Sequence, residues 1–257
     1  MPQPLVSCEQ IDGVAILTLC DPARRNVLSR AMLTELRDRV TELSREPQIK
    51  CIILAAQGPA FSAGHDLREV LAASAEELES LFALCTATME SIRTASQPVI
   101  AQVQGIATAA GCQLAATCDL VVAAEDASFA TPGVKIGLFC STPAVALSRA
   151  VGSKQAMEML LTGQPILAVE AQRIGLVNRV VPRDRLAAAT LELARQVADA
   201  SGETLALGKR AFYEQLPLDR SQAYELAERA MVENAQIADA REGMQSFLDK
   251  RPPKWQS

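Results

Sequence analysis

The sequence has no apolar run that approaches the ~20 residues of a membrane-spanning helix, so we expect no membrane span. Its first residues, MPQPLVSCEQIDG, have neither the basic start and apolar centre of a secretory signal nor the arginine-rich pattern of a transit peptide. The chain contains a single histidine, His65, and we expect no metal site. These absences predict a soluble mature chain.

Disulfide frameworks and basic surfaces are also lacking. The seven cysteines are odd in number, have no C-x-x-C spacing and mostly lie among apolar neighbours, which is typical of a reducing compartment. We therefore expect a cytoplasmic location. The net charge of −5 argues against a broad surface for nucleic acid.

What the sequence does contain is a set of short apolar runs, bounded by Gly, Pro or Asp, that predict buried strands. These runs are VAILTL (14–19), CIILAA (51–56), VIAQV (99–103) and LVVAA (120–124). Apolar residues recur at helical spacing between them, and strands separated by helices predict an α/β fold with a parallel sheet. From about Gly152 onward the spacing is almost entirely helical, and we find no internal repeat in the sequence.

Two loop segments contain the pattern of a binding site. FSAGHDLREV (61–70) follows the second strand, and TAAGCQLAATCDL (108–120) follows the third. Small residues and glycine after a strand allow backbone N–H groups to face a ligand, and a helix start adds its positive dipole end. The second segment alone is equally consistent with tight helix packing.

Together the two segments resemble the oxyanion-hole segments of the crotonase, or enoyl-CoA hydratase/isomerase, superfamily. The resemblance extends from VAILTL and PARRNVLS to FLDKRPPKW near the end, and so covers nearly the whole chain. It implies a crotonase-like ββα spiral over residues 1–200, with an acyl-CoA site, and a C-terminal helical trimerisation region over residues 201–257. The implied partners are an acyl-CoA thioester and further copies of this chain, as a trimer or a dimer of trimers.

The resemblance also implies roles for individual residues. The backbone N–H groups of His65 and Ala110 match the pair that polarises the thioester carbonyl and stabilises an enolate. In similar hydratases two glutamates manage the water and the α-proton. Here Gln113 and Gly133 stand at those two positions, and neither can exchange a proton near neutral pH.

Other side chains are candidates to replace the glutamates. His65 is the first candidate, because imidazole titrates near neutral pH, although only its N–H is needed for the oxyanion role. Asp66 is a further candidate. Cys140 lies in IGLFCSTPAV beside Ser141 and Thr142, and it is either a packed core thiol or, paired with His65, a nucleophile. We interpret Asp119 as a local hydrogen-bonding residue at the end of a helix.

Coenzyme A contacts follow from the same resemblance. Arg24 and Arg25 match a basic position that meets the CoA phosphates. Phe247 and Lys250 match a C-terminal aromatic and a lysine that reach the CoA of a neighbouring subunit. In similar proteins one further stretch surrounds the adenine and the thioester carbonyl of the ligand. The residues of this chain that match it are Ala63, His65, Asp66, Leu67 and Arg68. We expect no cofactor beyond the CoA moiety of the substrate.

Three functions remain open from the sequence. The first is an enzyme that acts on an acyl-CoA through an enolate with a nonstandard acid/base set, as an enoyl-CoA hydratase or isomerase of fatty acid metabolism. The second is a protein of the same fold that binds acyl-CoA without turnover. A scaffold role has little support, because nothing requires a scaffold to keep both oxyanion segments.

Overall fold

The fold is built on two β-sheets in a computed structural model, of which residues 4–256 are described. In the six-stranded sheet the order is β1-β2-β3-β5-β7-β10. β1 is antiparallel to β2, and the other neighbours are parallel. The bounds are β1 Val6–Ile11, β2 Val14–Leu19, β3 Cys51–Ala56, β5 Val99–Val103, β7 Leu120–Ala124 and β10 Arg179–Val181.

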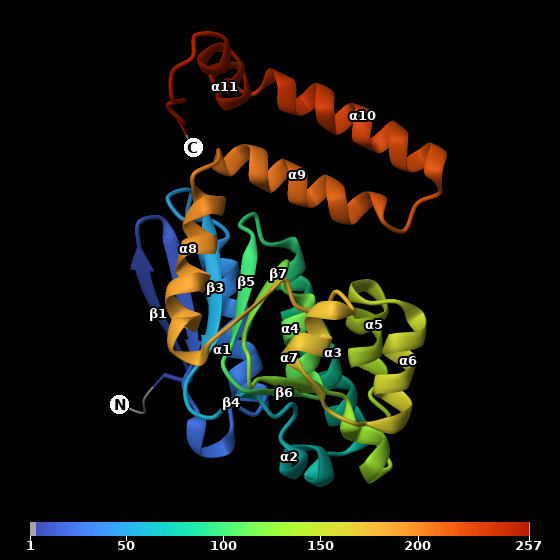
Figure 1. Cartoon of the computed structure of the whole chain (residues 1–257). Coiled ribbons are helices and arrows are strands. Elements are labelled where there is room, and N and C mark those ends of the chain that lie inside the picture. Colours follow the sequence, from blue (N-terminus) through green and yellow to red (C-terminus); the bar gives the residue numbers. More distant parts are fainter. Residues whose placement is uncertain (1–3, 257) are drawn as a thin grey trace.

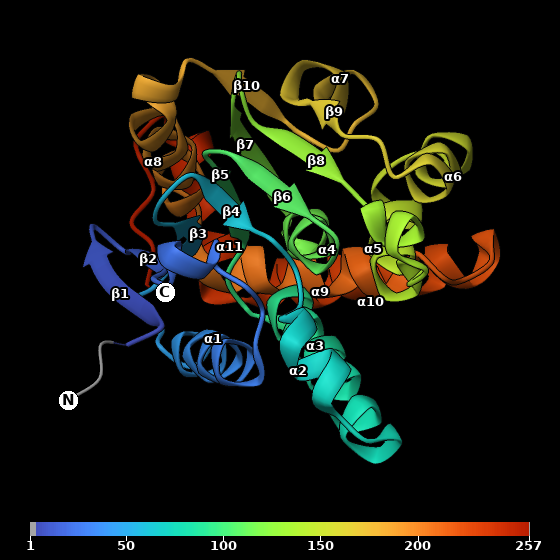
Figure 2. The same cartoon turned by 90° about the horizontal axis from the view of Figure 1, so that it is seen from below.

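The second sheet has four short strands in the order β4-β6-β8-β9. Their bounds are β4 Ala60–Ser62, β6 Ile106–Thr108, β8 Ser128–Ala130 and β9 Ile166–Leu167. The chain alternates between the sheets: β3 is followed by β4, β5 by β6 and β7 by β8, and a helix returns the chain each time. This is the expected spiral of ββα units, and Figure 2 shows β4, β6 and β8 side by side. The repeat lies in the structure and has no counterpart as a repeated sequence.

Helices surround the sheets. α8 packs on strands β2, β3, β5 and β7, and α1 packs against α3. α4 lies between the second sheet, α3 and α5. The bounds are α1 Arg30–Leu43, α2 Leu67–Ala72, α3 Ala75–Thr94, α4 Ala110–Thr117, α5 Ser141–Ala150, α6 Ser153–Thr162, α7 Ala168–Arg173 and α8 Leu186–Ala198. The 3-10 turns are η1 Pro22–Arg24, η2 Pro132–Ile136 and η3 Arg183–Arg185.

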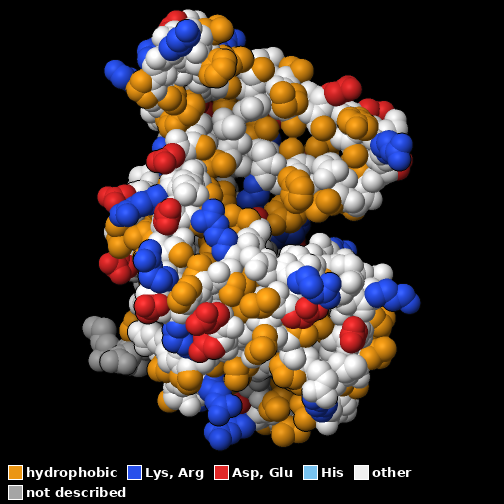
Figure 3. All heavy atoms as spheres, in the orientation of Figure 1, with side chains coloured by type: hydrophobic (Ala, Val, Ile, Leu, Met, Phe, Trp, Pro, Cys, Tyr) orange, Lys and Arg blue, Asp and Glu red, His pale blue; other side chains and the backbone are white. Residues whose placement is uncertain are grey.

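A helical tail follows the sheets. It consists of α9 Gly202–Gln215, α10 Arg220–Gln236 and α11 Ala238–Leu248. In Figure 1 the tail lies at the end of the molecule opposite α2. Figure 3 shows a hollow between the tail and the body. The corresponding cleft has a volume of about 880 Å³ and is lined by residues of α3, α4, α5 and α9.

The four long strands predicted from apolar runs are confirmed, with the same bounds as β2, β3, β5 and β7. The short strands β4, β6, β8, β9 and β10 have two or three residues each, too few for an alternating pattern to stand out. In residues 4–256 no helix has both the length and the apolar character needed to cross a membrane.

Candidate functional site

The first site turn follows β4 and centres on Gly64. Gly64 has φ +85°, a left-handed conformation that favours glycine. Its N–H donates to Ser62 Oγ (3.2 Å), and its carbonyl accepts from the Leu28 N–H (2.7 Å). These bonds fix the direction of the next N–H, that of His65.

The second site turn follows β6 and begins α4. Ala109, the N-cap residue, has φ 52° and ψ −121°. This conformation is strained for a residue with a side chain and costs about 1–3 kcal/mol. Its N–H donates to the Ala130 carbonyl at 2.9 Å. At Gly111 an added Cβ would lie 2.3 Å from the Ser62 carbonyl oxygen, so the start of α4 packs directly on β4.

The two turns converge. A Cβ built on Gly64 would lie 3.1 Å from the Ala110 nitrogen and 3.0 Å from the Thr108 carbonyl oxygen. Within residues 4–256 neither the His65 N–H nor the Ala110 N–H donates to a backbone carbonyl outside a helix or strand, and the first N–H of a helix has no partner inside it. Two adjacent donors at the positive end of a helix can stabilise a carbonyl oxygen that gains negative charge.

Gln113 lies one turn further along α4. It is 5% exposed, and its Oε1 atom is buried without a hydrogen-bond partner in the described part of the chain. The residue also lines the cleft between the body and α9. An uncharged amide at this point can hold a polar atom of a ligand, but it does not transfer protons near neutral pH.

Gly133 lies in η2, where no side chain fits. An added Cβ would lie 2.0 Å from the Leu138 carbonyl oxygen and 2.8 Å from Cys140 Sγ. The segment 138–140 therefore occupies the space into which a side chain of residue 133 would extend. A glutamate could not be placed here without moving the backbone.

The His65 ring is half-buried, and it packs edge-on against Phe82 with ring centroids 5.3 Å apart. Neither ring nitrogen has a hydrogen-bond partner among the described residues. Burial lowers the pKa of His65, and the nearby Leu28 carbonyl and Glu69 carboxylate oppose this only in part. The imidazole is therefore neutral over a wider pH range than an exposed one.

Cys140, the N-cap residue of α5, does not form the suggested pair with His65: no hydrogen bond joins them in residues 4–256. Burial raises the pKa of its thiol. An activated cysteine needs a lowered pKa, so this environment is that of a packed core thiol. The fully buried Cys112 thiol on α4 has a pKa raised to about 12 by burial.

The basic turn before α1 lies against the first site turn. Arg24 donates to Asp21 (2.8 Å) and to Asp66 (3.2 Å), and the Arg25 carbonyl accepts from the Ala63 N–H (2.9 Å). The second Asp66 oxygen caps α2 by accepting from the Arg68 N–H at 3.0 Å. The carboxylate of Asp66 is thus held in a structural role.

Other predicted CoA contacts are accessible. Leu67 and Arg68 are exposed at the start of α2. Phe247 and Lys250, in contrast, lie at the far end of the molecule with α11 (Figure 1), and do not join this group within one chain.

Asp119 is not the local residue that we expected. Its carboxylate accepts from Lys209 Nζ (2.7 Å), from the Tyr213 hydroxyl (2.8 Å) and from the Val99 N–H (2.7 Å). Lys209 and Tyr213 belong to α9, so this cluster joins the tail to the body. A charged residue inside an apolar stretch was the only signal in the sequence, and its two partners in α9 lie some ninety residues away.

The wound sheets and the paired N–H donors define a protein of the crotonase class. The family model for enoyl-CoA hydratase/isomerase matches residues 9–257, and the chain belongs to that family. It is 49% identical over 252 residues to mouse mitochondrial enoyl-CoA hydratase domain-containing protein 3, covering 98% of this chain and 84% of the relative. The human protein of that name is 47% identical over 255 residues, covering 99% and 84%.

Solved structures agree with this assignment. A crystal structure of enoyl-CoA hydratase from Mycobacterium smegmatis is 46% identical with a TM-score of 0.96, covering 99% of this chain and 100% of the other. The human enoyl-CoA hydratase domain-containing protein 3 has a TM-score of 0.94 at 47% identity, covering 98% and 100%. The predicted crotonase-like α/β fold is confirmed.

The predicted cytoplasmic location is contradicted. Relatives from mouse, rat and human, at 47–49% identity, are named as mitochondrial proteins. The prediction depended in part on reduced cysteines, which separate oxidising from reducing compartments but do not distinguish one reducing compartment from another.

Proposed function

We propose that this protein binds acyl-CoA thioesters, with the thioester carbonyl accepting hydrogen bonds from the N–H groups of His65 and Ala110. The convergence of the Gly64 turn on the Ala110 nitrogen is the observation that supports this most directly. Each such donor is worth about 3 kcal/mol when negative charge develops on the oxygen. We expect no cofactor beyond the CoA moiety.

The chemistry that follows is enolate formation with a nonstandard acid/base set. Gln113, one turn after Ala110 on α4, offers a neutral amide, and the space at Gly133 is filled by backbone. Of the three proposed substitutes, Asp66 is held in a helix cap, and the pKa of Cys140 is raised. His65 remains the first candidate, because its ring is neutral near pH 7; burial nevertheless makes it a weaker base than a free imidazole.

We accordingly expect native hydration of crotonyl-CoA to be weak or absent. General acid/base groups contribute about 10²- to 10⁴-fold each, so the absence of both glutamates moves the rate far towards background. Steady-state hydration by the native protein, the Gln113→Glu variant and the His65→Ala variant tests this. Fast native hydration that survives His65→Ala would contradict both the impaired chemistry and the role of His65.

The alternative, binding without turnover, shares the same site. Infrared difference spectra of crotonyl-CoA labelled with ¹³C at the carbonyl separate binding from chemistry. We expect a shift of the carbonyl stretch to lower frequency on binding, because two donors polarise the bond. A bound ligand with an unshifted carbonyl would remove the oxyanion assignment. A shift without turnover, in native protein and in Gln113→Glu alike, would favour the binding protein.

A further inference from the structure

The end of α11 holds a lysine in a conformation that favours glycine. Lys250 has φ +55°. The Arg251 N–H donates to the Ser246 carbonyl (3.0 Å) and the Lys250 N–H to the Phe247 carbonyl (3.2 Å), which is the hydrogen-bond pattern of a Schellman motif. Glycine is usual at the left-handed position of this motif. A strained lysine there points to a function for its side chain.

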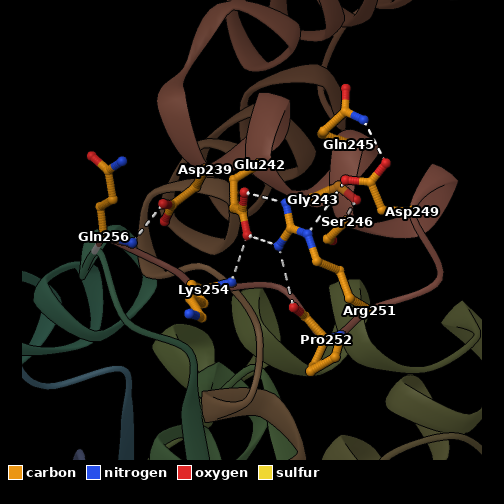
Figure 4. Close-up of polar contacts among 10 residues, drawn as sticks. All are labelled: Asp239, Glu242, Gly243, Gln245, Ser246, Asp249, Arg251, Pro252, Lys254 and Gln256. Carbon is orange, nitrogen blue, oxygen red and sulfur yellow. Dashed lines mark hydrogen bonds and ion pairs between the residues drawn. The ribbon is translucent and has the colours of Figure 1, made fainter.

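An ion pair turns the chain back along α11 after Lys250 (Figure 4). The two oxygens of Glu242 accept from Arg251 Nη1 (2.7 Å) and Nη2 (3.0 Å), and one also accepts from the Lys254 N–H (2.9 Å). Arg251 and the Lys254 amide lower the pKa of Glu242 to about 2. The carboxylate therefore stays ionised throughout the physiological pH range.

Trp255 joins this returning segment to the body. Its Nε1–H donates to the Asp199 carbonyl at 2.7 Å, at the end of α8. Its ring covers Gly243, where an added Cβ would lie 3.1 Å from the indole. We call Glu242, Arg251, Lys254 and Trp255 the C-terminal clasp.

The clasp leaves two side chains facing outward. Phe247 is 82% exposed. Lys250 is also exposed, and no carboxylate in residues 4–256 lies within ion-pair distance of it. An exposed lysine three residues after an exposed aromatic ring suits a ligand that has both phosphate groups and a planar base. Because α11 and α2 lie at opposite ends of the molecule (Figure 1), Phe247 and Lys250 can meet an acyl-CoA at the proposed site only if that site belongs to another copy of the chain.

We infer that the C-terminal clasp is a positioning device, which holds Phe247 and Lys250 towards the nucleotide part of an acyl-CoA bound by a second copy of this chain. The inference rests on the proposed function. Glu242 and Trp255 act through Lys250 and touch no ligand themselves. They order the backbone that carries Lys250 before the ligand binds, and so reduce the entropy that is lost when the Lys250 side chain is ordered on binding.

The test measures dissociation constants of crotonyl-CoA by calorimetry for the native protein, Lys250→Ala, Glu242→Gln and Trp255→Phe. We expect Glu242→Gln and Trp255→Phe each to weaken binding about three- to tenfold, since pre-ordering one long side chain is worth roughly that factor. Crotonyl-pantetheine, which lacks the nucleotide and its phosphates, should bind all four proteins alike. Light scattering checks that the variants keep the native mass.

A matched control and a double variant separate positioning from a general structural effect. Glu233→Gln breaks the exposed Arg210–Glu233 pair (2.9 Å) between α9 and α10, in the same tail but outside the clasp, and should leave the affinity unchanged. In Lys250→Ala, the further change Glu242→Gln should have no additional effect, because the residue it positions is absent.

The outcomes distinguish the two proposals. If the native protein binds crotonyl-CoA and Glu242→Gln binds it equally well, the clasp has no positioning role and the proposed function stands. The inference is also overturned if Glu242→Gln weakens crotonyl-CoA binding as much in the Lys250→Ala background as in the native protein. It is likewise overturned if Glu242→Gln weakens binding of crotonyl-pantetheine as much as binding of crotonyl-CoA. If the native protein binds no acyl-CoA, the proposed function fails and the inference fails with it.

Discussion

The space beside the Cα atom of Gly133 is already filled, so a side chain at this position would displace neighbouring atoms. We expect Gly133→Ala to destabilise the protein by about 1–3 kcal/mol, because its Cβ would overlap the Leu138 carbonyl. Gly208→Ala is the matched control: nothing lies within 4 Å of its added Cβ inside α9, and removing a helical glycine should stabilise by about 0.5–1 kcal/mol. Urea unfolding measures both. If Gly133→Ala left the free energy of unfolding unchanged, segment 138–140 would have to move aside at little cost.

His65 gives a pH dependence with a definite sign. Burial lowers the pKa of His65 in the folded protein below the ordinary value of 6.5. At a pH between the two pKa values, the unfolded chain therefore binds a proton at His65 that the native protein does not bind. The contribution of a neutral His65 to stability is therefore full above pH 6.5 and declines as the pH falls below it. We expect the difference in unfolding free energy between native protein and His65→Gln to be larger at about pH 7.5 than at about pH 5. A difference that grows on acidification would mean that the ring is stabilised in its charged form.

At this scale the sequence predicted the turns better than the side chains. Gly64 and the small residues 109–111 are recognisable because tight turns after strands restrict residue type. The closure of Gly133 depends on a backbone oxygen five residues away, and the Arg24–Asp66 bond joins residues 42 apart. Neither leaves a local pattern in the sequence.

Among the elements, α9 depends on a polar joint with the body. The side chains of Lys209 and Asp119 are only 7% and 15% exposed. We expect Lys209→Met to cost about 3 kcal/mol, since it leaves Asp119 without its charge partner in a largely buried place. Arg210→Met, which breaks the exposed pair with Glu233, should cost less than about 1 kcal/mol.

Unfolding in urea checks this pair of variants, and Asp119→Asn completes a double-mutant cycle with Lys209→Met. The two losses should be far from additive. Additive losses would mean that the two groups are stabilised separately. The elements themselves were predictable where a continuous apolar run or a helical apolar pattern extends over five or more residues, as in β3 and α1 respectively, whereas the joint between Asp119 and α9 depends on tertiary contacts.

For the whole molecule we expect a trimer or a dimer of trimers. The tail exposes large apolar side chains that a lone chain would leave in water: Phe212, Leu216, Tyr224, Met231 and Val232. Light scattering at micromolar concentration should give three or six times the 27.5 kDa of one chain. A mass of 27.5 kDa would contradict this expectation.

The winding of the chain between the two sheets has a consequence for how the protein folds. β3, β5 and β7 cannot pair in the first sheet without bringing β4, β6 and β8 together in the second, because only three residues or fewer join each strand to the next. Neither sheet is therefore a separate folding unit, and the N–H groups of His65 and Ala110 meet only when successive turns of the spiral have stacked. Most strand pairings join distant parts of the chain, a topology that slows folding, and we expect the two site turns to come together only after these strands have paired.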